Sequence, residues 1–345
     1  MVPQFRLSRA LVIASFVASS IVCGPLWAPP LPPPSKVLQS PRTQVVVGTY
    51  VDRLADGRYR FKKVDDLRGP DSAPDEIVVR GPDWLLGWLS PNTQYLFAYT
   101  AYVRNPRFRK ETIVDTNGPQ LIDSSGLEPA LFIEAAGLRE QLIHTLDKPS
   151  LQTDAFIEQI AAGLGSTDIQ LQNFYAAELN LLPDLGKRKD KSLVKAVTAL
   201  LKNADGHPTA RATLLRVAAA NPGTYSRALL TEVVDQVLLE APLVGYQDPH
   251  SRDGELLSAA LQLTREPSFT VRRAALERLV SCDNTALAED ALLALRSHFP
   301  EHERSAVLTT LKQTQLPTVT REFLLDHLRR LDLAAKHLTK TVPES

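Results

Sequence analysis

The second half of the chain is a succession of apolar helical segments separated by short breaker segments, and this pattern constrains the fold more than any other feature. Most separators contain proline, glycine, asparagine or aspartate, the residues that start and stop helices. The pattern predicts helices over residues 151–163, 167–181, 189–203, 208–220, 224–240, 253–265, 269–281, 285–298, 302–314 and 318–339.

These predicted helices recur at a regular offset. The clearest copy follows Pro267 and Ser268, which we expect to start and cap a helix over 269–281. Four of its positions recur 32 residues later: Arg272, Ala274, Leu276 and Leu279 match Arg304, Ala306, Leu308 and Leu311. Helices therefore arrive about every 16 or 17 residues, in pairs with a period near 33. One such pair cannot bury its own apolar face, so we expect neighbouring pairs to stack.

The same helix carries a family resemblance. Residues 271–279 read Val-Arg-Arg-Ala-Ala-Leu-Glu-Arg-Leu, which resembles the Val-Arg-x-Ala-Ala-x-x-x-Leu helix of HEAT and armadillo repeats. The resemblance covers roughly residues 150–340 and is sharpest over 267–312. Two departures stand out: the period is shorter than in the usual HEAT repeat, and the aspartate that often precedes Val-Arg is absent. The resemblance implies an α-solenoid scaffold with a protein-binding face and no enzymatic activity, in which Arg272 and Arg273 are repeat-face residues.

Residues 43–135 have the composition of a small antiparallel β domain. Residues 45–51 are β-branched and aromatic, and Asp56-Gly57 precedes an alternating segment, which predicts a hairpin. The most aromatic segment, 93–103, is the expected central strand, with short strands following at 112–115 and 120–123. Five or six short strands suit a barrel or a sandwich, and we expect an OB-like barrel. The predicted fold class is α+β and multidomain: this β domain, a connecting helix or linker over 136–150, and HEAT-like helical repeats over 151–340.

The N-terminal 24 residues have the layout of a secretory signal peptide. Arg6 and Arg9 precede an apolar run over 10–22 that ends near small residues, and this run is shorter than the ~20 residues of a membrane span. Residues 25–42 are rich in proline and are expected to form an extended polyproline II spacer. Beyond the signal, one cysteine remains, Cys282, which is expected to be buried. The absence of an internal disulfide favours a bacterial periplasm. A retained membrane anchor or lipidation of Cys23 is the alternative.

Known catalytic and cofactor-binding motifs are absent from the sequence. It contains no Gly-x-Ser-x-Gly, Walker loop, His-Glu-x-x-His or Cys-x-x-Cys motif, so we expect no catalysis, cofactor or metal. His298, His302 and Glu303 have a spacing that suggests a metal site, but Pro300 between the histidines is expected to break their shared helix face. His327, in a charged helix, is expected to be solvated. The balance of 39 basic against 39 acidic residues argues against nucleic acid as a partner.

Two groups of residues are the candidates for partner binding. Arg104, Arg107 and Arg109 follow the aromatic strand as a basic cluster, and Tyr246 lies in the longest interruption of the helices, where a loop folding back over an apolar edge is the alternative. We therefore expect an exported protein-interaction or scaffold protein whose partner is another protein. Membrane contact is expected only through an uncleaved signal or a lipidated Cys23. The alternatives are an enzyme accessory subunit, or an envelope-polysaccharide-binding module that uses the β-domain aromatics, which are Trp84, Trp88, Tyr95, Tyr99 and Tyr102.

Overall fold

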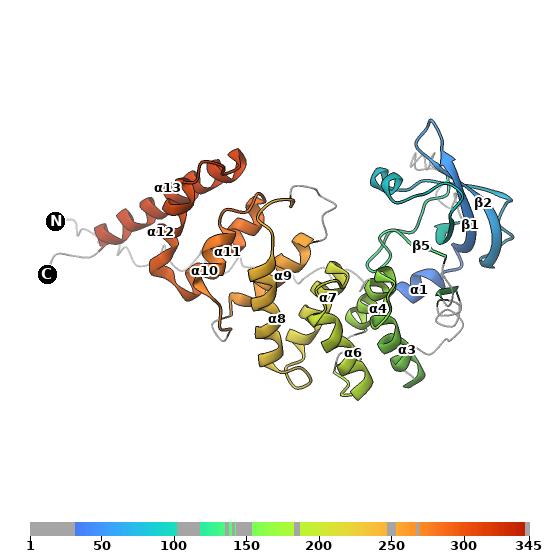
Figure 1. The fold of residues 1–345 in the computed structure, drawn as a ribbon, viewed down its shortest axis with the longest axis horizontal. Helices are drawn as coiled ribbons and strands as arrows, with labels where there is room; N and C mark the ends of the chain where they lie inside the picture. The colour runs from blue at the N-terminus through green and yellow to red at the C-terminus, as the bar shows by residue number, and fades with distance from the viewer. Residues whose placement is uncertain are drawn as a thin grey trace, which may run out of the picture. The chain divides into compact units, whose positions relative to one another are not determined.

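The computed structural model of this chain confirms the α+β class: an antiparallel sheet is followed by helices (Figure 1). It describes residues 32–101, 118–134, 138–139, 142, 154–182, 187–246, 253–266 and 269–341, with side chains described up to residue 333. The expected signal peptide and the expected strand over 112–115 lie outside the described residues.

The sheet over the described residues has five strands in the order β3-β2-β1-β4-β5, with every neighbouring pair antiparallel. The strands are β1 (Thr43–Arg53), β2 (Tyr59–Arg68), β3 (Glu76–Val79), β4 (Gln94–Thr100) and β5 (Leu131–Ile133). The predicted hairpin is confirmed, because Gly57 takes a positive φ of 86° in the turn between β1 and β2. The prediction of the central strand was wrong: β1 holds that position, and the aromatic β4 lies beside it. The apolar residues of β1 are buried on both faces of the sheet, which is typical of a central strand.

A short segment at 119–122 bridges the residue after β3 and strand β4, which are not neighbours in this sheet. Leu121 N donates to Arg80 O, directly after β3, at 2.8 Å, and Ile122 N donates to Ala98 O in β4 at 2.9 Å. The named strands form an open sheet where we expected a barrel or sandwich, and the expected strand at 120–123 is reduced to isolated bridges at Gln120 and Leu121.

The two faces of the sheet are buried in different apolar clusters. One face carries an aromatic cluster in which the rings of Phe61 and Phe97 lie 4.4 Å apart, and Leu85 of the 3-10 helix η1 (Asp83–Gly87) packs into it. The other face, which includes Val47 and Phe132, is continuous with the core of the helices. Because successive strand residues point to opposite faces, the same strands contribute side chains to both clusters.

The proline-rich segment is not extended throughout. Residues 34–38 form helix α1 (Pro34–Leu38), with Pro34 at a first-turn position, where its missing N–H costs nothing. Ser35 and Leu38 are buried, and Leu38 belongs to the main core. The polyproline II prediction is therefore wrong for these residues, since they pack against the folded chain.

The helices after the sheet begin and end close to the predicted positions. They are α3 (Asp154–Leu164), α4 (Ile169–Leu181), α6 (Lys191–Lys202), α7 (Pro208–Ala220), α8 (Arg227–Glu240), α9 (Asp253–Thr264), α10 (Arg273–Leu279), α11 (Thr285–His298), α12 (Pro300–Leu311) and α13 (Thr318–Thr341). Helix α10 begins four residues later than predicted, with Arg272 at its N-cap position, and the expected cap Ser268 lies outside the described residues. The reason is tertiary: Phe269 is buried ahead of the helix, with the Arg227 guanidinium 4.1 Å above its ring.

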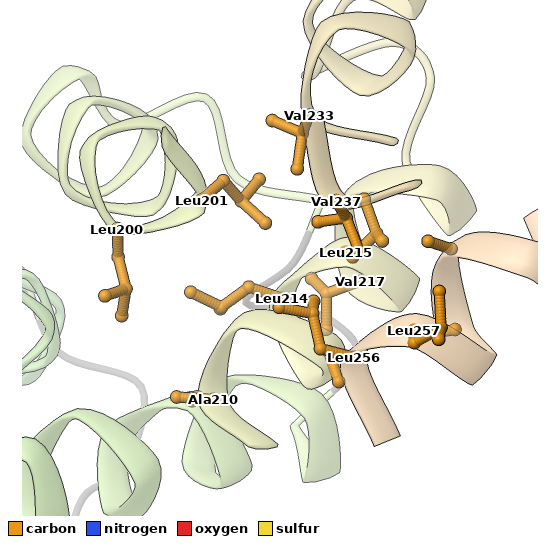
Figure 2. Close-up of a cluster of buried hydrophobic side chains, with 14 of the residues drawn as sticks. Leu200, Leu201, Ala210, Leu214, Leu215, Val217, Val233, Val237, Leu256 and Leu257 are labelled. Carbon is orange, nitrogen blue, oxygen red and sulfur yellow. The ribbon is translucent and has the colours of Figure 1, made fainter. Parts of the chain in front are cut away.

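The helices pack as consecutive pairs. Contacts join α3 to α4, α6 to α7, α8 to α9, α10 to α11 and α12 to α13. Contacts also join α4 to α7, α7 to α9 and α9 to α11, so each pair rests on the next. Figure 2 shows buried side chains of α6, α7, α8 and α9, among them Leu201, Leu215 and Val237, gathered in one cluster. This stacking gives each pair the buried face that it lacks alone.

Arginine side chains close the C-termini of several helices. Arg211 donates to the Leu201 carbonyl at the end of α6, and Arg321 donates to the Leu311 carbonyl at the end of α12. Arg278 donates to three carbonyls at the end of α8, at 2.8 to 3.2 Å. These carbonyls have no partner within their own helix, and a cation also favours the negative end of the helix dipole. The three arginines therefore stabilise the helix pairs.

Candidate functional site

An apolar hollow lies where η1, β4, β5 and the start of α4 meet, and it is the strongest candidate site within the described residues. Its volume is about 400 Å³. The lining side chains are Trp88, Tyr95, Leu131, Ile133, Asp168, Ile169 and Gln170. Three of them are large, apolar and exposed: Trp88 at 47%, Ile133 at 61% and Ile169 at 45%. Large apolar side chains gathered at one hollow are the usual mark of an interaction site.

The Trp88 side of the hollow is held by hydrogen bonds to a buried tyrosine. The Tyr95 hydroxyl donates to the Trp88 carbonyl at 3.2 Å and accepts from the Ser90 amide at 2.9 Å. The ring of Trp84 packs edge-on against that of Trp88, with centroids 5.2 Å apart. Leu85, fully buried, anchors the 3-10 helix between these tryptophans. These contacts hold the segment that carries Trp88 in place.

The opposite side comes from the start of α4 and the end of β5. Asp168 caps α4 by accepting from the Gln170 amide at 2.8 Å and the Leu171 amide at 3.3 Å. This cap places Ile169 at the first helical position, where its side chain is exposed. In β5, Phe132 faces the core, and alternation turns Ile133 to the other side. The Asp168 carboxylate is engaged in capping, and the exposed side chains around the hollow offer apolar contacts.

The most strongly perturbed carboxyl group lies at a packing contact of α4. Glu178 is 0% exposed, and its Oε1 accepts from the Ser35 amide at the start of α1. Its Oε2 is buried with no hydrogen-bond partner among the described residues. Burial raises the pKa of Glu178 to about 7, although hydrogen bonding from Ser35 and the charge of Lys36 oppose the shift. The hydrogen bond between Ser35 and Glu178 therefore joins α1 to α4.

Of the partner-binding candidates from the sequence, the structure describes Tyr246. Tyr246 is buried, and Asp283 holds its loop by accepting from the Gly245 amide at 2.7 Å and the Tyr246 amide at 3.2 Å. Burial, together with the nearby Cys282, raises the pKa of the Tyr246 hydroxyl. Tyr246 thus packs into the core at the edge of the loop. Arg104, Arg107 and Arg109 lie outside the described residues.

The β-domain aromatics divide into buried and exposed groups. Tyr95 and Tyr99 are buried. Among the described members of these five aromatic residues, only Trp88 has a side chain that is about half exposed. Tyr102 lies outside it. Cys282 is buried as expected, and desolvation raises the pKa of its thiol to about 11.

The histidines of the last helices have structural partners. The prediction of a solvated His327 was wrong: its Nε2 lies 2.9 Å from Glu303 Oε1 in a buried contact, because α13 packs on α12. Arg296 also donates to Glu303, at 2.7 and 3.0 Å. Burial acts to raise the pKa of Glu303, but the hydrogen bonds from Arg296 and His327 outweigh it and lower that pKa. His302 contacts Arg273 instead, and no cluster of three potential metal ligands occurs among the residues described.

The sequence did not single out the three exposed apolar residues as a site. Trp88 was noted only as one of five aromatics, while Ile133 and Ile169 lie in ordinary apolar contexts. Their common feature is exposure, which depends on the tertiary fold.

None of the helices in the described ranges has the length and apolarity required to cross a bilayer. No protein-family model, no curated protein and no solved structure matches this chain.

Proposed function

We propose that this chain is a protein-interaction or scaffold protein that holds an apolar side chain of its partner in the hollow around Trp88, Ile133 and Ile169. The single observation that carries the proposal is the exposure of these three large apolar side chains at one hollow of about 400 Å³. Burying the exposed half of such a side chain is worth ~1 kcal/mol, so three of them contribute ~3 kcal/mol. That energy corresponds to roughly a hundredfold in affinity.

The proposal includes a finer description of the fold. We infer a HEAT-like solenoid over 151–340, supported by the offset of 32 residues and by the successive contacts of α4, α7, α9 and α11. The stacked helix pairs make a rigid support, which reduces the entropy lost when a partner binds.

An exported, periplasmic location remains part of the proposal. Its support is the layout of residues 1–24 and the single buried thiol beyond them, with a membrane anchor or lipidated Cys23 as the alternative. An enzyme accessory subunit would use the same hollow. Polysaccharide binding is the second candidate, favoured by the packed ring pair of Trp84 and Trp88.

Site-specific photo-crosslinking tests the proposal. A benzophenone amino acid replaces Ile169 in the full chain, which is then irradiated in cells of its source. We expect one discrete protein adduct that is lost when Trp88→Ala is added. The matched control places the same crosslinker at Val319, which is 56% exposed on α13, and it is expected not to yield that adduct.

Two outcomes would oppose protein binding at this hollow. One is the absence of a protein adduct at position 169, and the other is an adduct that survives Trp88→Ala in a variant with unchanged circular dichroism. Retention on isolated envelope polysaccharide that depends on Trp88, without a protein adduct, would support the second candidate instead.

A further inference from the structure

A second hollow lies on the surface of α6, and its rim is basic. It has a volume of about 550 Å³ and shares no residue with the hollow at Trp88. Lys189 comes from the segment before α6, Lys191 and Lys195 come from α6 itself, and Thr224 comes from the segment before α8. The floor between the lysines is formed by Val194, Thr198 and Ala199. Positions 191 and 195 are one helical turn apart, so their ammonium groups share a face of α6.

Within the described part of this region, the three lysines have no nearby carboxylate. Asp154 and Asp190 are both engaged by Arg188, each at 2.9 Å, and Glu232 is engaged by Lys202 at 2.8 Å. Across the described residues, no carboxylate lies within 4.0 Å of the ammonium groups of Lys189, Lys191 or Lys195. The hollow therefore concentrates positive charge in a chain whose formal net charge is zero.

Two exposed arginines elsewhere in the array pair with an acidic residue of a neighbouring helix. Arg272 of the α10 N-cap reaches Asp235 of α8 at 2.9 Å, and Arg304 of α12 reaches Asp332 of α13 at 3.1 Å. Lys191 and Lys195 differ from these arginines, because they lie beside an apolar floor and no acidic residue among those described lies opposite them. An external acidic group would supply the missing complement.

We propose that the hollow on α6 binds an acidic segment of a partner protein, with carboxylates at Lys191 and Lys195 and an apolar side chain on Val194. The floor contributes methyl groups, which suit an aliphatic side chain between acidic residues. The lining contains no aromatic and no arginine side chain, the groups that stack on bases and read their edges. The chemistry of the hollow therefore fits an acidic peptide better than a nucleic acid.

Fluorescence anisotropy with the full chain tests this site. The probe is a fluorescein-labelled peptide of four Glu-Glu-Leu repeats, and the neutral control peptide has four Gln-Gln-Leu repeats. We expect the acidic probe to bind, to weaken as sodium chloride rises, and to lose about tenfold in affinity in the double variant Lys191→Glu with Lys195→Glu. Val194→Ser is expected to weaken it about threefold without changing its salt dependence.

Controls separate this site from other charges and from the hollow at Trp88. Lys312→Glu reverses an exposed lysine at the end of α12 and is expected to leave the affinity unchanged, as is Trp88→Ala. Equal binding of both peptides, or unchanged affinity in the folded double variant, would overturn the proposal. Tighter binding of a twelve-nucleotide oligothymidylate with the same lysine dependence would also overturn it, in favour of nucleic acid.

Discussion

Replacing Glu178 by glutamine is expected to remove a pH dependence of folding that comes from one buried carboxyl group. Glu178 is 0% exposed, and burial raises its pKa from 4.5 to about 7. A raised pKa means that the folded protein binds a proton more tightly than the unfolded chain. The contribution to stability is therefore complete below pH 4.5 and is lost progressively as the pH rises from about 4.5 to about 7.

The size of the stability loss follows from how far the pKa of Glu178 is raised. Each pKa unit corresponds to about 1.4 kcal/mol, so the wild-type chain loses on the order of 3 kcal/mol of unfolding free energy across this window. Glutamine keeps the oxygen that accepts from the Ser35 amide, and it carries no charge to desolvate. Relative to the wild type, Glu178→Gln should therefore gain about 3 kcal/mol between pH 4.5 and pH 8.

Urea unfolding at pH 4.5, 6, 7 and 8, followed by circular dichroism, measures this difference. Glu158→Gln is the matched control, because Glu158 is an exposed glutamate on the neighbouring helix α3. Its profile should follow that of the wild type. If the Glu178→Gln and wild-type profiles were parallel over the whole range, the buried carboxylate would not be the source of the pH dependence, and the reasoning would be refuted.

Two further substitutions test the packing of the helices. Gly163→Ala should lower the unfolding free energy by about 1–3 kcal/mol, because a Cβ there would lie 1.8 Å from the buried Tyr175 ring. Gly223→Ala, where a Cβ meets nothing within 4 Å, is the control, and equal thermal shifts in both would contradict the packing argument. Arg278→Met should cost about 1–3 kcal/mol in urea unfolding, since it removes three hydrogen bonds to the end of α8. Arg304→Met removes an exposed ion pair and should cost less than about 1 kcal/mol; an equal or larger loss would count against the capping role.

The helices were predictable because their signals are local. Helices α7 and α11 begin and end at the expected residues, since Pro208 occupies a first-turn position and the Asn284 side chain caps α11 through two amides. The β1–β2 hairpin was predictable for the same reason, from Asp56-Gly57. Each of these features depends on residues within a few positions of one another.

Other features depend on residues that are distant in the sequence. The late start of α10 follows from the burial of Phe269 against Arg227, and the link at 119–122 follows from hydrogen bonds to two separate strands. The local sequence of the proline-rich segment favours an extended chain, yet α1 packs as a helix under Glu178. In these places tertiary contacts outweigh local preference.

The candidate sites also combine features that local sequence predicts with features that depend on distant contacts. The sequence by itself indicated that a β-rich segment precedes paired helices with apolar faces. The tertiary structure was needed to show that Lys191 and Lys195 lie at one hollow with no acidic neighbour among the described residues. It was also needed to show that Tyr246 is buried and that Trp88, Ile133 and Ile169 surround one hollow. The physical reason is range: helix periodicity and capping act over one or two turns, whereas exposure and charge pairing depend on which distant segments pack together.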